Sequence, residues 1–325
     1  MLGAGLAILS AITFGLNNAA ARRGVLSGSV LQGLVVTVPL GVPLFALLCL
    51  PIGGFAVLRE FSAPAWAWMA AAGIVHFIIG RYGNYRATRA LGATLSGPLQ
   101  QTSILVALVL AMILLDERLT PLKLAGIALV VLGPTVMTRG LNKPGGMRAK
   151  SGFTPDYMEG SAWSMVCAVA YGTSPLLIRF GLEGSHGMVG SIAGGLVSYV
   201  AATLVLGLIA LLPGNPAHVK TLDRTTARWF AISGVFVFLS QVFRYMALAV
   251  APVSVVVPVQ RLSMAFRAIF SWMLNRDHEV FGFWALFGIA LSLFGALALT
   301  VSTEFVLELI PLPPAIADLA RWQWP

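Results

Sequence analysis

The sequence is dominated by apolar runs of about 20 residues, separated by short segments that contain Gly, Pro and charged side chains. A helix needs about 20 apolar residues to cross the hydrocarbon core of a bilayer. Hydrophobic residues make up 58% of the 325-residue chain and charged residues only 10%, which excludes a soluble globular domain. The pattern predicts an all-α integral membrane protein with ten transmembrane helices, near residues 2–21, 31–51, 65–88, 95–115, 121–139, 160–180, 188–212, 228–249, 254–274 and 280–301.

The most polar connection between these runs, at residues 138–159, divides the chain nearly in half. It is rich in Gly, Lys and Arg, a composition typical of a linker. We therefore expect a first five-helix unit at 1–140, a linker at 141–157, a second five-helix unit at 158–301 and a C-terminal tail at 302–325.

The two halves repeat each other in sequence. A shift of 160 residues superposes five identical pairs without a gap, and these are Tyr85 and Tyr245, Ala87 and Ala247, Pro98 and Pro258, Gln100 and Gln260, and Ser103 and Ser263. Because each half has an odd number of spans, the second half is predicted to lie inverted in the membrane. Inverted repeats are the plan of many secondary transporters, whose substrate site lies between the repeats.

Two long segments carry a family resemblance. ALGATLSGPLQQTSILVALVLAMILLDERLTPLKLAGIALVVLG and its weaker copy APVSVVVPVQRLSMAFRAIFSWMLNRDHEVFGFWALFGIALSLFG resemble the paired EamA repeats of the drug/metabolite transporter superfamily. The most family-like element is Glu117 to Thr120, after the fourth span. The resemblance covers residues 2–301 and implies ten helices, alternating access and a central cavity lined by the first, third and fourth spans of each half. It implies no particular substrate, because the superfamily includes exporters of amino acids, sugar phosphates, nucleotide sugars and cationic drugs.

Two arguments about orientation disagree. The odd-numbered loops hold about eleven Lys and Arg, against about five on the even-numbered loops and the tail, which puts both termini outside by the positive-inside rule. The family resemblance implies cytoplasmic termini, so both orientations stay open. The expected location is a bacterial inner or plasma membrane.

Two spans carry matched polar faces. The spacing i, i+3, i+4 puts three side chains on one helix face, and it occurs in Arg81, Asn84 and Tyr85 of the third span and in Gln241, Arg244 and Tyr245 of the eighth. An arginine at the centre of a span costs about 2.5–3.5 kcal/mol on insertion scales, so these residues are predicted to bind substrate. The alternative is that the arginines reach headgroups at the helix ends and the tyrosines only pack.

The fourth and ninth spans have matched segments of proline and polar residues. A proline frees a backbone carbonyl one turn earlier, and polar side chains three apart share a face. Such paired segments indicate a binding site, although hydrogen bonds between helices are the alternative. The predicted site residues of these spans are Gln100, Ser103, Gln260, Arg261, Ser263 and Arg267, with Asn17 of the first span and Tyr171 of the sixth completing the lining.

The remaining titratable residues narrow the chemistry further. All twelve Asp and Glu fall in loops, at helix ends or in the tail, so the arginines need an anion from elsewhere, and a substrate phosphate, sulfonate or carboxylate can supply it. His76 is a candidate for proton coupling, with a neutral packed histidine as the alternative. Cys49 and Cys167 are expected to be buried apolar residues. We expect no metal site and no cofactor.

These observations favour a secondary transporter of a small anionic metabolite. The alternative is an exporter of neutral or cationic amino acids or aromatic drugs. A membrane-embedded enzyme or a scaffold is disfavoured because no catalytic constellation accompanies the matched polar faces. The net charge of +9 is dispersed without a basic tract, which disfavours nucleic acid and favours anionic lipid headgroups as partners. A monomer and a homodimer are both compatible with the sequence.

Overall fold

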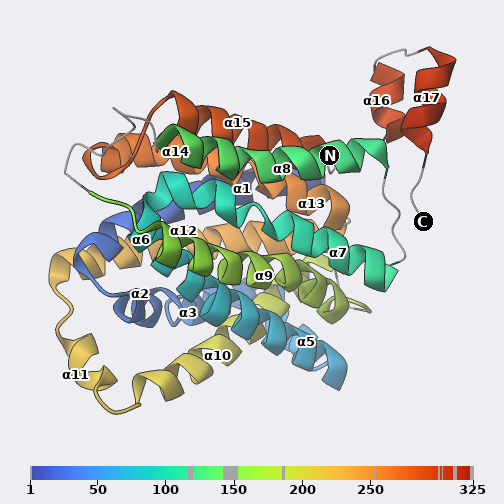
Figure 1. Ribbon diagram of the computed structural model, residues 1–325. Coiled ribbons are helices and arrows are strands. Elements are labelled where there is room, and N and C mark those ends of the chain that lie inside the picture. Colours follow the sequence, from blue (N-terminus) through green and yellow to red (C-terminus); the bar gives the residue numbers. More distant parts are fainter. Residues whose placement is uncertain are drawn as a thin grey trace.

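The computed structural model describes residues 2–115, 120–141, 153–184, 187–251, 253–298, 301, 303–309 and 313–322, and every element within them is a helix (Figure 1). In chain order these are α1 (Leu2–Ser27), α2 (Val30–Thr37), α3 (Gly41–Ile52), α4 (Gly54–Leu58), α5 (Ala63–Gly73), η1 (Ile74–Gly80), α6 (Arg81–Gln100), α7 (Ser103–Leu115), α8 (Pro121–Leu141), α9 (Tyr157–Gly181), α10 (Gly187–Ala210), α11 (Asn215–Lys220), α12 (Arg224–Val250), α13 (Val253–Gln260), α14 (Ser263–Asn275), η2 (Arg276–His278), α15 (Phe283–Ala298), α16 (Thr303–Leu309) and α17 (Pro314–Arg321). Most of the predicted linker, at 142–152, lies outside the described residues, as does Glu117.

Within the described residues, six helical segments are long and apolar enough to cross a membrane. They are Leu2–Ser27, Val30–Ile52, Ala63–Ala107, Tyr157–Gly181, Gly187–Ala210 and Arg224–Val250. Shorter apolar helices occupy Pro121–Gly133 and Phe283–Gly295. The all-helical membrane fold is therefore confirmed, whereas the count of ten spans stays a prediction.

The predicted third and fourth spans run together in the 45-residue segment Ala63–Ala107, and Gly92 divides them. Gly92 has φ +84° and ψ 165°, a conformation open in practice only to glycine. A Cβ at this position would also come within 2.9 Å of the Glu279 carboxylate. The chain can therefore turn from one span into the next without an intervening loop.

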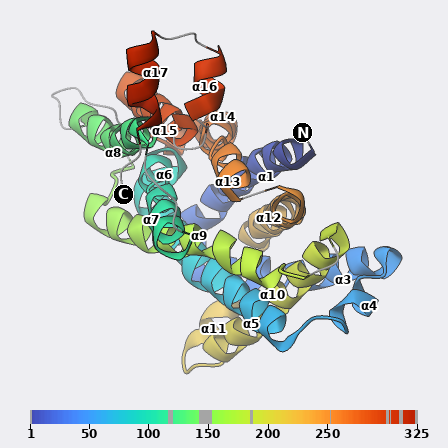
Figure 2. The same cartoon turned by 90° about the vertical axis from the view of Figure 1, so that its right-hand side faces the viewer.

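The two halves contact each other reciprocally (Figure 2). Helix α1 packs against α12 and α14, and its counterpart α9 packs against α6 and α7. At the start of the two halves, Phe14-Gly15 matches Tyr171-Gly172 at a shift of 157. Gly15 of α1 lies against Phe266 of α14, and Gly172 of α9 lies against Val106 of α7. A reciprocal contact pattern is what a two-fold relation between the repeats requires.

The largest apolar cluster lies between α2, α3, α10 and α12, with aromatic rings at its centre, among them Phe45, Phe77, Tyr199 and Phe230. Both cysteines are free and buried, as expected from their apolar surroundings. Helices α16 and α17 lie at the edge of the bundle, where α17 contacts α8 (Figure 1). Arg244, Arg261 and Arg267 of the second half line cavities together with Phe14 of the first half.

Candidate functional site

Two helices of the bundle are interrupted at repeat-related positions. Turn residues at 101–102 separate α6 from α7, and turn residues at 261–262 separate α13 from α14. The two interruptions meet, because Nε2 of Gln101 donates to the backbone carbonyl of Arg261 at 3.1 Å. Discontinuous helices that face each other are a common way to build a substrate site inside a membrane protein.

Two small cavities lie beside this meeting point. One has a volume of about 50 Å³ and the other about 30 Å³. They share four wall residues, namely Phe14, Tyr171, Arg261 and Ser263. Because one water needs about 10–15 Å³, these cavities hold only a few waters. Side chains must therefore move before a larger solute can enter.

Arg244 lines the larger cavity and is held only by neutral groups. Its Nη1 lies 3.0 Å from Nδ1 of His76 and donates to Oε1 of Gln241 at 3.2 Å, and its Nη2 donates to Ser174 at 3.1 Å. A guanidinium can donate but not accept, so an unprotonated nitrogen of the His76 ring can accept from Arg244.

His76 lies on η1, a π-helix whose wide turns often mark functional sites. The ring of Tyr171 stacks on the His76 ring at a centroid distance of 4.4 Å. Nε2 of Gln241 lies 3.2 Å from Nε2 of the ring. The structure thus places the proton-coupling candidate directly against Arg244.

Arg267 lines the smaller cavity and is also held by neutral oxygens. Its Nη1 donates to Gln100 at 3.0 Å, and its Nη2 contacts oxygens of Asn18, Asn84 and Thr88 at 2.9–3.1 Å. The surrounding oxygens solvate the guanidinium without cancelling its charge.

Arg261 sits at the interruption between α13 and α14 and lines both cavities. Its Nε is buried and has no hydrogen-bond partner among the described residues. No described carboxylate lines either cavity. Three guanidinium groups therefore converge on a space between the repeats in which none of the described lining residues is an anion.

The other predicted site residues divide into two groups. Five of them line the cavities, namely Gln100, Gln241, Gln260, Ser263 and Tyr171. Five others line neither cavity. The five are Arg81, which donates to Thr37 and Tyr199; Asn17, which accepts from Ser233; Tyr85, near Thr37 and Ser233; Tyr245, which donates to Ser198; and Ser103, which donates to the Gln100 carbonyl. Asn84 lines neither cavity but hydrogen-bonds to three wall residues of the smaller one, Asn18, Gln100 and Arg267.

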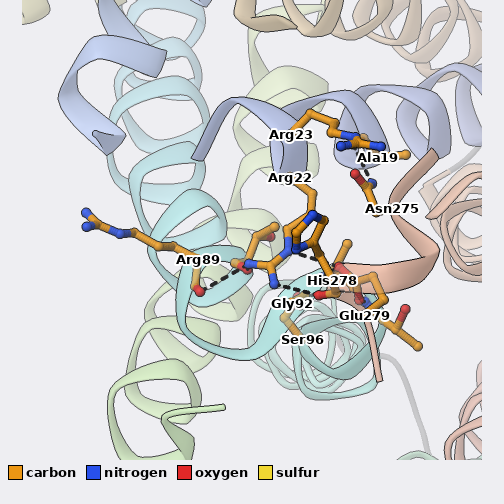
Figure 3. Close-up of polar contacts among 12 residues, drawn as sticks. Ala19, Arg22, Arg23, Arg89, Gly92, Ser96, Asn275, His278 and Glu279 are labelled. Carbon is orange, nitrogen blue, oxygen red and sulfur yellow. Dashed lines mark hydrogen bonds and ion pairs between the residues drawn. The ribbon is translucent and has the colours of Figure 1, made fainter. Parts of the chain in front are cut away.

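A second polar cluster, missed by the sequence analysis, lies next to Arg267 (Figure 3). Arg22 and Glu279 form an ion pair, with Nε and Oε1 3.1 Å apart and side chains 1% and 0% exposed. The carboxylate also accepts from the backbone N–H groups of Ala93 and Thr94 at 2.7 and 2.8 Å. Glu279 therefore caps the helical segment that starts after Gly92.

The remaining donors of Arg22 bind backbone carbonyls around the same turn. Nη1 donates to Thr88 and Arg89, at 2.9 and 3.2 Å, and Nη2 donates to His278 at 2.8 Å (Figure 3). Thr88 joins the two clusters, because its hydroxyl contacts Arg267. The ion pair is thereby connected to the polar residues around Arg267.

The Lys/Arg count treats Arg22 as a loop residue, and this is wrong because Arg22 lies in α1 and is buried. Glu279 does lie in a connection, as expected, but it is buried as well. The sequence held one signal for Glu279, because a two-residue slip in the repeat, to a shift of 162, pairs it with Glu117 of the family-like element.

Comparison with known proteins identifies the fold and the family. The model of the EamA-like transporter family matches residues 1–139 and 158–301. The chain belongs to the EamA-like transporter family. The resemblance seen in the sequence is thereby confirmed, and this EamA-like protein is an integral, multi-pass membrane transporter with two EamA repeats.

One solved structure, described only as "Crystal structure of protein", is 19% identical to this EamA-like protein and has a TM-score of 0.58. The match covers 91% of this chain and 96% of the other, and at such low identity it concerns the fold alone. None of the curated proteins matches the chain.

Proposed function

We propose that this protein is a secondary transporter that moves a small anionic metabolite across the membrane. The observation that carries the proposal is the convergence of Arg244, Arg261 and Arg267 on cavities whose described walls contain no carboxylate. Charges buried without a counter-ion are costly, and a bound anion removes that cost through charge-assisted hydrogen bonds.

Alternating access is the proposed mechanism, with the two repeats inverted relative to each other. The reciprocal contacts of α1 and α9 support a two-fold relation between the repeats. The buried Arg22–Glu279 pair, connected to Arg267 through Thr88, is the proposed closure on that side. Transport then requires this pair to separate in one phase of the cycle and the groups around His76 and Arg244 to separate in the other.

The proposed function predicts which compounds stabilise the purified protein. Phosphorylated, sulfonated or carboxylated metabolites should raise its melting temperature, because a ligand that binds only the folded state stabilises it. Matched neutral amides and cationic amines serve as controls in the same thermal-shift screen. Stabilisation by aromatic cations or neutral amino acids, with no response to any anion, would contradict an anionic substrate.

We further propose that His76 couples protons to anion binding. Arg244 faces the ring, and its positive charge disfavours a second cation at His76. Tyr171, Gln241 and Phe77 complete its surroundings and contribute no negative charge at neutral pH. A bound anion offsets the repulsion from the arginines and favours protonation of the ring.

Anion binding should therefore take up protons. Wild-type protein in weak buffer should raise the pH on addition of substrate, read with an indicator dye, and binding should tighten as the pH is lowered. His76→Gln should bind without proton uptake. Equal uptake by the variant would assign the coupling to another group.

A further inference from the structure

The arginines are divided between two cavities, and this arrangement bears on the shape of the substrate. Arg244 lines only the larger cavity and Arg267 only the smaller one, while Arg261 belongs to the wall between them. A small anionic group placed in either cavity meets only one of these two arginines. From the division we infer that the site takes a small dianion with its two acidic groups at opposite ends, an inference that rests on the proposed function.

The first acidic group belongs in the larger cavity, between Arg244 and Arg261. The other polar residues of this cavity are neutral, including Ser10, Ser240 and Gln260, where Nε2 of Gln260 donates to Ser10 at 2.8 Å. These hydroxyl and amide groups can donate to a carboxylate or phosphate after small rotations. Arg261 lines the same cavity, and its buried Nε, which has no partner among the described residues, is a donor available to such a group.

The second acidic group belongs in the smaller cavity, against Arg267. Four side-chain oxygens contact the Nη atoms of Arg267 and hold its guanidinium in place. Its Nε has no hydrogen-bond partner among the described residues. The nearby Glu279 is already engaged by Arg22 and by two backbone N–H groups. Arg267 therefore retains capacity for a substrate anion.

The part of the substrate between its acidic groups meets the shared wall. Phe14 and Tyr171 form an edge-to-face pair there, with ring centroids 6.0 Å apart. This aromatic surface suits a short carbon skeleton. The inferred class is a dicarboxylate or a phosphorylated carboxylate, in which apolar atoms join two anionic groups.

The test compares dianions with matched monoanions on the purified full-length protein. Titration calorimetry uses succinate, glutarate, adipate and phosphoglycolate, each beside the derivative in which one carboxylate is replaced by an amide. At least one dianion should bind about 10- to 150-fold more tightly than its amide, the ratio expected from one charge-assisted hydrogen-bonded contact. Ratios near one for anions that do bind would overturn the two-ended site and leave the proposed function standing. Failure of every anion to bind, with binding of neutral or cationic solutes, would overturn both.

Variants locate the two ends. In Arg267→Gln and Arg244→Gln, the ratio of dianion affinity to the affinity of the matched amide should fall toward one. The monoanion should still bind at the remaining end. Arg267→Lys and Arg244→Lys keep the positive charge and should retain part of the preference, which guards against loss through misfolding. Arg179→Gln, on the exposed end of α9, is the matched control and should bind as wild type does. An unchanged dianion preference in folded Arg267→Gln and Arg244→Gln would contradict the inference.

Discussion

Replacement of Arg261 by methionine should abolish tight substrate binding and at the same time make the protein more stable. The binding loss follows from the position of Arg261 in the wall of both cavities, and a charge-assisted hydrogen bond to an ionised group contributes about 1.5–3 kcal/mol, or about 10- to 150-fold in affinity. The gain in stability follows from the unpartnered buried Nε, because removing such a group relieves about 1–3 kcal/mol.

Opposite effects on binding and stability are the signature of a residue kept for function rather than for folding. The two quantities are measured on one preparation, affinity by calorimetry and stability by the melting temperature in detergent. Arg179→Met on the exposed end of α9 is the control and should change neither substantially. If Arg261→Met lowered the melting temperature and left affinity intact, Arg261 would be a structural residue and its proposed part in anion binding would be wrong.

Glu279→Met should be among the most destabilising single substitutions in the chain. It removes the carboxylate that pairs with Arg22 and that accepts two backbone N–H groups at the turn after Gly92. Breaking a buried ion pair from one side typically costs about 3–5 kcal/mol, since the other charge stays buried without its counter-ion. The free energy of unfolding, measured in mixed micelles, should fall by about that amount.

The chain offers an internal control for this ion pair. Arg86 and Glu159 are 2.5 Å apart, but their side chains are 33% and 37% exposed, so Arg86→Met should cost at most about 1 kcal/mol. The double variant Arg22→Met with Glu279→Met should recover part of the loss, because neither charge then remains. Equal melting temperatures for Glu279→Met and Arg86→Met would show that burial adds nothing to the Arg22–Glu279 pair.

Much of the architecture could be predicted from the apolar runs, because a bilayer accepts only segments whose backbone groups are satisfied internally. The helical class and the two repeats followed from span length and from ordered matches such as Tyr85 with Tyr245. The family followed from the segment around Gln100 and its copy around Gln260. These features are local or periodic, and sequence records them directly.

Sequence alone could not separate the residues that line a cavity from those that pack beside it. Tyr85 and Tyr245 each belong to a polar triplet with i, i+3, i+4 spacing, and this spacing predicted that they line the site. Instead, their hydroxyls contact Ser233 and Ser198 in the packed interior. Helical spacing defines which side chains share a face, but the neighbouring helices decide what that face meets.

Sequence determined that this chain is a helical membrane protein of two repeats with buried arginines and few acids. Only the tertiary structure decided that Arg261 has an unpartnered nitrogen at the meeting of two interrupted helices, and that the loop residue Glu279 is buried against Arg22 more than 250 positions away. The physical reason is that the cost of a buried charge depends on partners brought in by distant segments, and their approach requires the Gly92 turn and the packing of both halves together.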